Sequence, residues 1–157
     1  MPESDWKESL AKCFEELRII EEYKGETPEH FKQFCEFIAE PAFESLTKEL
    51  RKYGIKSKSR KIKSRFFAFQ VNFPKSRVDN FHYIICLPKG SYELRLKLRI
   101  RGRRNKKSVI EEKELPFMKD VLPSDILKLK KEDVIRDVIK HFKNFNFDAL
   151  TKLESKA

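Results

Sequence analysis

The apolar positions of the chain predict two helices at the N-terminal end, strands in the middle and a further helix near the C-terminus. In the first helix, expected over residues 5–23, apolar side chains recur at every third or fourth position and form one stripe. The members of this stripe are Trp6, Leu10, Cys13, Phe14, Leu17 and Ile20. A second helix is expected over residues 28–53, because Gly25 follows the stripe and Thr27-Pro28 has the form of a helix start.

The second helix has its own apolar side. It is expected to bury Phe31, Phe34, Cys35, Ile38, Phe43, Leu46, Leu50 and Tyr53. Pro41 falls inside this run. A proline there removes one backbone hydrogen bond and its ring clashes with the preceding turn, so we expect a kink or a split at this point.

The middle of the chain changes to a period of two, which is the period of a β-strand. Four strands are expected, over residues 60–73, 81–87, 92–101 and 108–115, and they are followed by a helix over residues 131–145. The first strand has apolar residues on both faces, as in a strand inside a sheet. Short connections favour antiparallel neighbours in sequence order. We therefore predict a single α+β domain over residues 1–157, a two-layer sandwich with the helices on one face of a four-stranded meander.

Charge is distributed unevenly along the chain, whose formal net charge is +10. Residues 1–50 contain 6 basic and 13 acidic side chains, whereas residues 51–107 contain 19 basic and 2 acidic ones. Residues 108–157 contain 10 of each. A molecule with one strongly positive part is expected to meet a negatively charged partner there.

The centre of the positive part is the sequence SYELRLKLRIRGRRNKKS, residues 91–108. Apolar side chains alternate here with charged ones, so one face of the strand is a ladder of cations. Cations on one face are about 6.6 Å apart, which is close to the spacing of successive phosphates in a nucleic-acid strand. Such a face is expected to bind nucleic-acid phosphates without strong sequence preference.

The candidate phosphate-binding residues form two groups. The ladder and the loop after it supply Arg95, Lys97, Arg99, Arg101, Arg103, Arg104, Lys106 and Lys107. The basic segment from Arg51 to Arg65 adds Lys58, Arg60, Lys61, Lys63 and Arg65. Phe66 and Tyr83 are candidate platforms for stacking of bases.

A second interpretation is that the ladder is partly neutralised by the next strand. A hairpin register in which partner numbers sum to 209 sets Lys97 opposite Glu112 and Arg95 opposite Glu114. In that register Arg99, Arg101 and the loop from Arg103 to Lys107 remain for contact with a partner. A third interpretation is a protein-interaction or self-assembly module, in which the basic face meets an acidic protein surface such as the N-terminal helices of another copy.

Enzyme chemistry has less support, and the protein is expected to be a non-enzymatic binding domain. Glu111-x-Lys113 on a predicted strand, with Asp79 upstream, is a remote match to a metal-dependent nuclease. The chain has four Gly and lacks both GxGxxG and GxSxG. Its scattered thiols and imidazoles predict neither a metal site nor a cofactor. They are Cys13, Cys35, Cys86, His30, His82 and His141.

Location is predicted from what the chain lacks. No apolar run reaches the roughly 20 residues that cross a membrane. The first ten residues are acidic and have no apolar core of a secretory signal. We therefore expect a cytoplasmic protein with no membrane partner. The abundance of Lys and Glu is typical of thermophile proteins.

Overall fold

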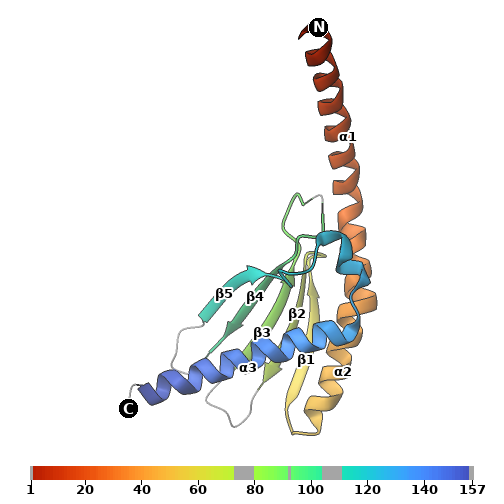
Figure 1. The fold of residues 1–157 in the computed structure, drawn as a ribbon. Helices are drawn as coiled ribbons and strands as arrows, with labels where there is room; N and C mark the ends of the chain where they lie inside the picture. The colour runs from red at the N-terminus through yellow and green to blue at the C-terminus, as the bar shows by residue number, and fades with distance from the viewer. Residues whose placement is uncertain (1, 73–79, 92, 104–110, 156–157) are drawn as a thin grey trace.

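The computed structural model describes residues 2–72, 80–91, 93–103 and 111–155 (Figure 1). The N-terminal helical part consists of α1 (Pro2–Phe34), the π-helical turn η1 (Cys35–Ala39) and α2 (Glu40–Arg51). The strands are β1 (Lys56–Ile62), β2 (Phe66–Asn72), β3 (Asn80–Cys86), β4 (Lys97–Gly102) and β5 (Glu111–Pro116). The 3-10 helix η2 (Pro123–Lys128) and α3 (Lys131–Ser155) follow. No helix in the described ranges is both long and apolar enough to span a bilayer.

The sheet is an open antiparallel meander in the order β1-β2-β3-β4-β5, so the α+β class is confirmed. It has five strands, and the prediction of four was wrong. The expected strand over residues 60–73 contains a hairpin turn, in which Lys63 and Ser64 have φ values of 51° and 54°. The Arg65 N–H donates to the Ile62 carbonyl at 3.3 Å. Gly or Asn usually marks such a turn, and neither is present here.

The core lies between the sheet and the helices α2 and α3. One face of the sheet contributes Phe67, Phe69, Val71, Phe81, Tyr83, Ile85, Leu98 and Ile100, all of them buried. The Phe43 ring of α2 packs 5.0 Å from Phe67 and 4.9 Å from Phe69, measured between ring centroids. On α3, Phe142 packs 5.4 Å from Phe81. These contacts go to one face and leave the opposite face, here called the open face, without a helix over it (Figure 1).

The two expected N-terminal helices are one continuous helical segment. α1 passes through Gly25 and Pro28 without a break. A Gly costs a helix only about 1 kcal/mol, and a Pro removes one hydrogen bond, so neither forces the chain out of the helix. At Pro41 the irregularity takes the form of the π-helical turn just before it, where the Glu40 N–H donates to the Cys35 carbonyl five residues earlier. Tyr53, expected to be buried, lies after α2 and is 75% exposed.

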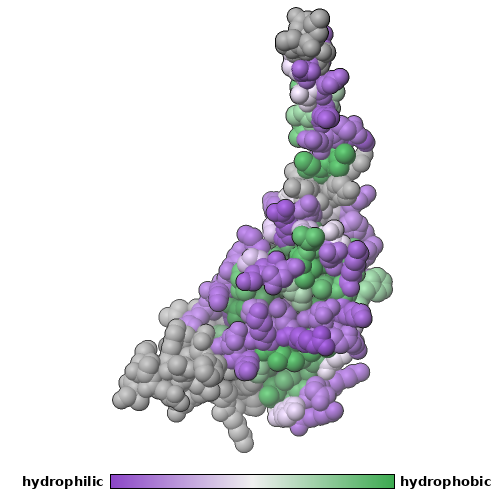
Figure 2. All heavy atoms as spheres, in the orientation of Figure 1, coloured by the Kyte–Doolittle hydropathy of each residue, from purple (hydrophilic) through white to green (hydrophobic). Residues whose placement is uncertain are grey.

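The N-terminal half of α1 projects away from the sheet (Figure 1). The predicted stripe is present on it, but the sheet does not cover it: Trp6 is 56% exposed, Phe14 63% and Leu17 51%. Figure 2 shows hydrophobic groups at the surface of this projection among hydrophilic ones. Cys13 is accordingly exposed, whereas Cys35 and Cys86 are buried, as expected for structural thiols.

Candidate nucleic-acid interface

The open face carries cations in two columns, one on β1 and one on β4. The β1 column is Lys56, Lys58 and Arg60, and the β4 column is Lys97, Arg99 and Arg101. Directly paired residues of an antiparallel sheet share a face. The register joins Lys58, Gln70, His82 and Arg101 in one row across four strands. The next row joins Arg60, Ala68, Ile84 and Arg99.

A neutral strip separates the two columns. β2 and β3 supply its side chains, which are Ala68, Gln70, His82 and Ile84, each of them partly buried. Adjacent strands are about 4.8 Å apart, so the columns are about 14 Å apart. The open face is therefore a neutral floor with cations on both sides. The Gln70 amide donates to the Asn72 side-chain oxygen at 2.8 Å.

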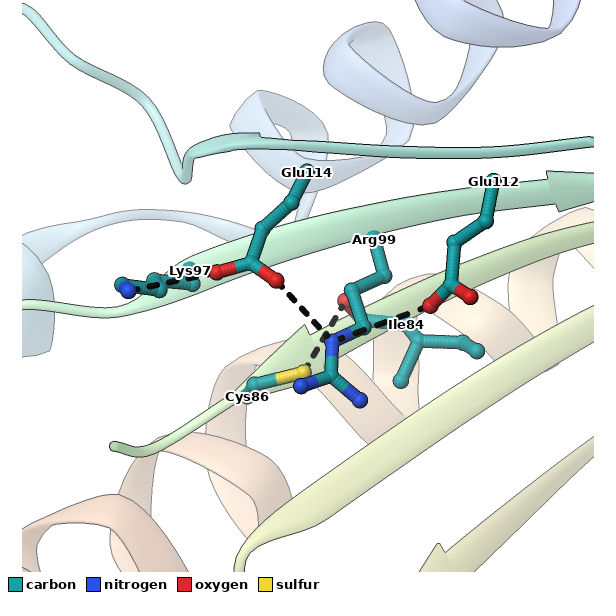
Figure 3. A network of polar contacts seen from close by, with 6 residues as sticks. All are labelled: Ile84, Cys86, Lys97, Arg99, Glu112 and Glu114. Carbon is teal, nitrogen blue, oxygen red and sulfur yellow. Dashed lines mark hydrogen bonds and ion pairs between the residues drawn. The ribbon is translucent and has the colours of Figure 1, made fainter. Parts of the chain in front are cut away.

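The β4 column is partly neutralised by β5. Lys97 Nζ lies 3.2 Å from Glu114 Oε1. Arg99 Nε lies 3.4 Å from Glu114 Oε2 and 3.9 Å from Glu112 Oε1 (Figure 3). The hydrogen bond from Lys97, with the nearby charges of Lys97 and Arg99, lowers the pKa of Glu114. Glu114 therefore stays ionised and holds these cations along the sheet.

The register predicted for this hairpin was wrong. Partner numbers sum to 213, so Glu114 is opposite Arg99 and Glu112 is opposite Arg101. The reason is the residue that follows β5. Phe117 is buried, and its N–H donates to the Leu96 carbonyl at 3.0 Å. Burial of Phe117 shifts β5 by four residues from the register predicted from charge pairing, because the apolar contact outweighs surface ion pairs.

Arg99 was predicted to be unpaired, and the structure shows the opposite. Its Nε is buried and makes no well-aligned hydrogen bond, although both carboxylates lie within ion-pair distance. Its guanidinium lies 5.5 Å from the Phe66 ring centroid, and the Arg65 guanidinium lies 5.4 Å from the same centroid. Arg99 is therefore a structural cation as much as a surface one.

Other predicted residues lie away from the open face or have partners of their own. Lys61 faces α2, with its Nζ 3.5 Å from Glu40 and 5.7 Å from the Phe67 ring centroid. Tyr83 cannot stack on a base, because it is fully buried and its hydroxyl donates to Asp137. Arg95 precedes β4, and its Nε lies 2.6 Å from Glu93.

The remaining predicted residues lie near the ends of the strands. Lys63 is exposed in the β1–β2 turn, and Arg65 Nε donates to the Leu87 carbonyl at 3.1 Å. Arg103 follows β4 and is partly buried. Arg104, Lys106 and Lys107 lie outside the described residues. The exposed cations that face the open side of the sheet are therefore Lys56, Lys58, Arg60, Lys97 and Arg101.

His82 is a residue of this face that the sequence did not single out. It lies in the row between Lys58 and Arg101. Burial lowers the pKa of His82, and the charges of Arg101 and Lys58 lower it further. The imidazole is therefore neutral at pH 7 and offers one donor and one acceptor to a ligand. Its position on the open face depends on the strand order, which the sequence alone does not show.

The nuclease interpretation finds no metal centre in the described part of the chain. Glu111 and Lys113 are exposed on the edge strand β5, on the face opposite Glu112. Asp79 lies outside the described residues. Within those residues, no group of three His, Cys, Asp or Glu side chains could hold a metal ion.

Comparison with known proteins adds no homologue. No protein-family model, curated protein or solved structure matches this chain. A functional proposal for it depends on the geometry and charge of its own residues.

Proposed function

We propose that the open face binds single-stranded nucleic acid, chiefly through its phosphates. The observation that supports this is the pair of cationic columns about 14 Å apart with a neutral floor between them. A flexible single strand can lay its bases on the floor and bring phosphates to either column. A duplex keeps its bases paired and stacked inside the helix, so it cannot lay them on the floor.

The affinity is expected to come mostly from four cations. Among the described residues, Lys56, Lys58, Arg60 and Arg101 are exposed on this face and take part in no ion pair, in contrast to Lys97 and Arg99. They can therefore contact phosphates without giving up an internal partner. Backbone contacts of this kind carry little sequence preference and weaken strongly as salt rises.

The floor would make weaker contacts with bases. Phe66 lies under two guanidinium groups, so a base would stack on an Arg–Phe layer more readily than on the bare ring. The imidazole of His82 and the amide of Gln70 can hydrogen-bond to base edges. Because only a few side chains of the floor can contact bases, the binding is expected to have little sequence preference.

The test is anisotropy of a labelled 20-nucleotide single strand at low and moderate salt, with a duplex of the same sequence for comparison. Lys58→Glu/Arg60→Glu/Arg101→Glu is expected to bind at least tenfold more weakly than wild type. The matched control is Lys119→Glu/Lys140→Glu/Lys143→Glu, which changes the net charge equally and alters exposed residues elsewhere. Equal losses in both variants, or no binding by wild type, would refute the proposal.

An acidic protein surface is the second candidate partner. The chain itself shows that cations of this face accept carboxylates, since Glu112 and Glu114 lie against Arg99. The same experiment separates the two partners. Displacement of the oligonucleotide by polyglutamate at equal charge concentration would favour the acidic protein. Displacement by unlabelled single strand only would favour nucleic acid.

A further inference from the structure

The projecting part of α1 has the hydrophobic spacing of a coiled coil. Trp6, Leu10, Cys13, Leu17 and Ile20 are separated by alternating steps of four and three residues. This is the a/d pattern of a heptad repeat, in which the seam of one helix packs against the seam of another. The seam is open in the single chain, with Trp6 56%, Leu10 48% and Leu17 51% exposed. A soluble helix that keeps such a seam in water is expected to have a helical partner.

A hollow lies at the base of the projection, where α1 meets the rest of the molecule. Its volume is about 440 Å³, and its walls come from α1, the segment before β4 and the region of η2. Figure 1 shows η2 beside α1 at this level. The lining residues are Ile19, Ile20, Thr27, His30, Glu93, Leu94, Pro123, Ser124 and Leu127. The size and the largely apolar wall suit one large aromatic side chain.

We propose that two copies of this chain pair through α1 as an antiparallel two-stranded coiled coil, with Trp6 of each copy in the hollow of the other. In the proposed register, the number of a residue and the number of the residue that it faces on the partner add up to about 30. Leu10 then meets the partner's Ile20, and Cys13 meets the partner's Leu17. Trp6 falls at the level of position 24, between the partner's Ile20 and the partner's Thr27. Both of those positions line the hollow.

Charge supports the antiparallel orientation. In this register Lys7 faces the partner's Glu21, and symmetry repeats the contact. The antiparallel pair has one unfavourable contact, between Glu16 and the partner's Glu16. A parallel pair in the same heptad frame would instead set Glu16 against the partner's Glu21 twice.

The shape of the molecule supports the same orientation. The projecting part of α1 leaves the sheet at one end only (Figure 1). An antiparallel pair therefore places the two sheets at opposite ends of the coiled coil, whereas a parallel pair would crowd them at one end. The overlap runs from Trp6 to position 24 of each chain, which is 19 residues, somewhat under three heptads, or about 28 Å of helix. Three heptads are near the lower limit for a stable coiled coil, so occupation of the hollow by Trp6 would add to its stability.

The first test is the mass in solution by light scattering. Wild type is expected at twice the 18.8 kDa chain mass. Leu10→Asp/Leu17→Asp is expected at the chain mass, and because both side chains are exposed, its fold should be unchanged by circular dichroism. The control Ile139→Asp removes another exposed apolar side chain from a helix and should leave the dimer intact. A monomeric wild type, or a dimer that survives the double change, would overturn the proposal.

The second test concerns register and orientation. Lys7→Glu and Glu21→Lys should each weaken the dimer, and the double swap should restore it. Rapid oxidation of Cys13 to an intermolecular disulfide would instead indicate a parallel pair. In the antiparallel register the two Cys13 residues are offset by four positions, which is too far for a disulfide.

The third test uses tryptophan fluorescence to ask whether Trp6 occupies the hollow. Trp6 is the only tryptophan of the chain, so its emission reports on this site alone. The emission is expected to be blue-shifted in the dimer, and to move to longer wavelength in Leu127→Asp or on dilution to monomer. An emission maximum that stays the same in dimer and monomer would exclude Trp6 from the hollow.

Discussion

The two cationic columns of the open face differ in what surrounds them. Lys97 and Arg99 on β4 lie within 3.4 Å of carboxylate oxygens on β5. Lys58 and Arg60 on β1 lie at the other edge of the sheet, next to the neutral residues Gln70 and Ala68. A cation next to an acidic strand serves mainly the sheet itself, and a cation at a neutral edge is available to a partner. The cations of β4, which stand out most in the sequence, are therefore less available to a partner than the cations of β1.

Removal of two cations of the β1 column, Lys58 and Arg60, is the strongest test of this difference. Lys58→Gln/Arg60→Gln is expected to lower affinity for single-stranded oligonucleotide by about tenfold at low salt, because two phosphate contacts are lost. Anisotropy titrations measure this change. The comparison variant Lys97→Gln/Glu114→Gln removes an internal ion pair and should stay within about twofold of wild type. A larger loss in the second variant would reverse the assignment of the two columns.

Removal of the acidic partners of the β4 column should raise the affinity for oligonucleotide. Glu112→Gln/Glu114→Gln removes the carboxylates that hold Lys97 and Arg99, so oligonucleotide affinity should rise about three- to tenfold. The salt dependence of binding should steepen at the same time. The control Glu36→Gln/Glu49→Gln makes the same change of net charge on exposed positions of the helical part. An equal gain in the control would mean that only net charge matters.

Stability should separate the columns as well. Arg99→Ala removes two ion pairs and the contact with Phe66, and it should lower the free energy of unfolding by about 1 kcal/mol. Lys58→Ala should change it by less than about 0.5 kcal/mol. Urea denaturation followed by circular dichroism measures both. Similar values for the two variants would argue against a structural role for Arg99.

The hairpin that holds the β1 column can be stabilised without altering its cations. Ser64→Gly relieves a positive φ of 54° at a residue with a side chain. The expected gain in the free energy of unfolding is about 0.5–1 kcal/mol. The test is thermal denaturation, with Ser59→Gly on β1 as a control that should lose stability. Oligonucleotide affinity should stay unchanged in Ser64→Gly.

The smallest expected effect concerns pH. The pKa of His82 is lowered by burial and by the charges of Arg101 and Lys58. Protonation adds a positive charge to the floor, so oligonucleotide affinity should rise, by up to about threefold, as pH falls through this depressed pKa. His82→Asn should flatten that part of the pH profile. Because the folded pKa of His82 lies below the unfolded one, the free energy of unfolding should fall as pH drops from the unfolded pKa, about 6.5, to the folded pKa, and should level off below it. NMR titration of His82 in Lys58→Gln should show a higher pKa.

Local patterns in the sequence predicted much of this fold. The period of two over Leu98 and Ile100 identified β4, because alternation of faces is a property of a single strand. The hairpin at Lys63–Arg65 escaped prediction, because its positive φ values fall on residues that do not usually mark such turns. The candidate site was predicted in part: Lys58, Arg60 and Arg101 lie on the open face as exposed cations, whereas Lys61 and Tyr83 face the helices.

The sequence by itself determined the helical character of the two ends of the chain, the alternation along the strands and the concentration of positive charge between residues 51 and 107. These depend on residues close together in the chain. Only the tertiary structure decided which cations face open solvent, which carboxylates neutralise them, and that the stripe on α1 has no cover within the described chain. Those outcomes depend on strand order and on burial of residues such as Phe117, which join segments far apart in the sequence.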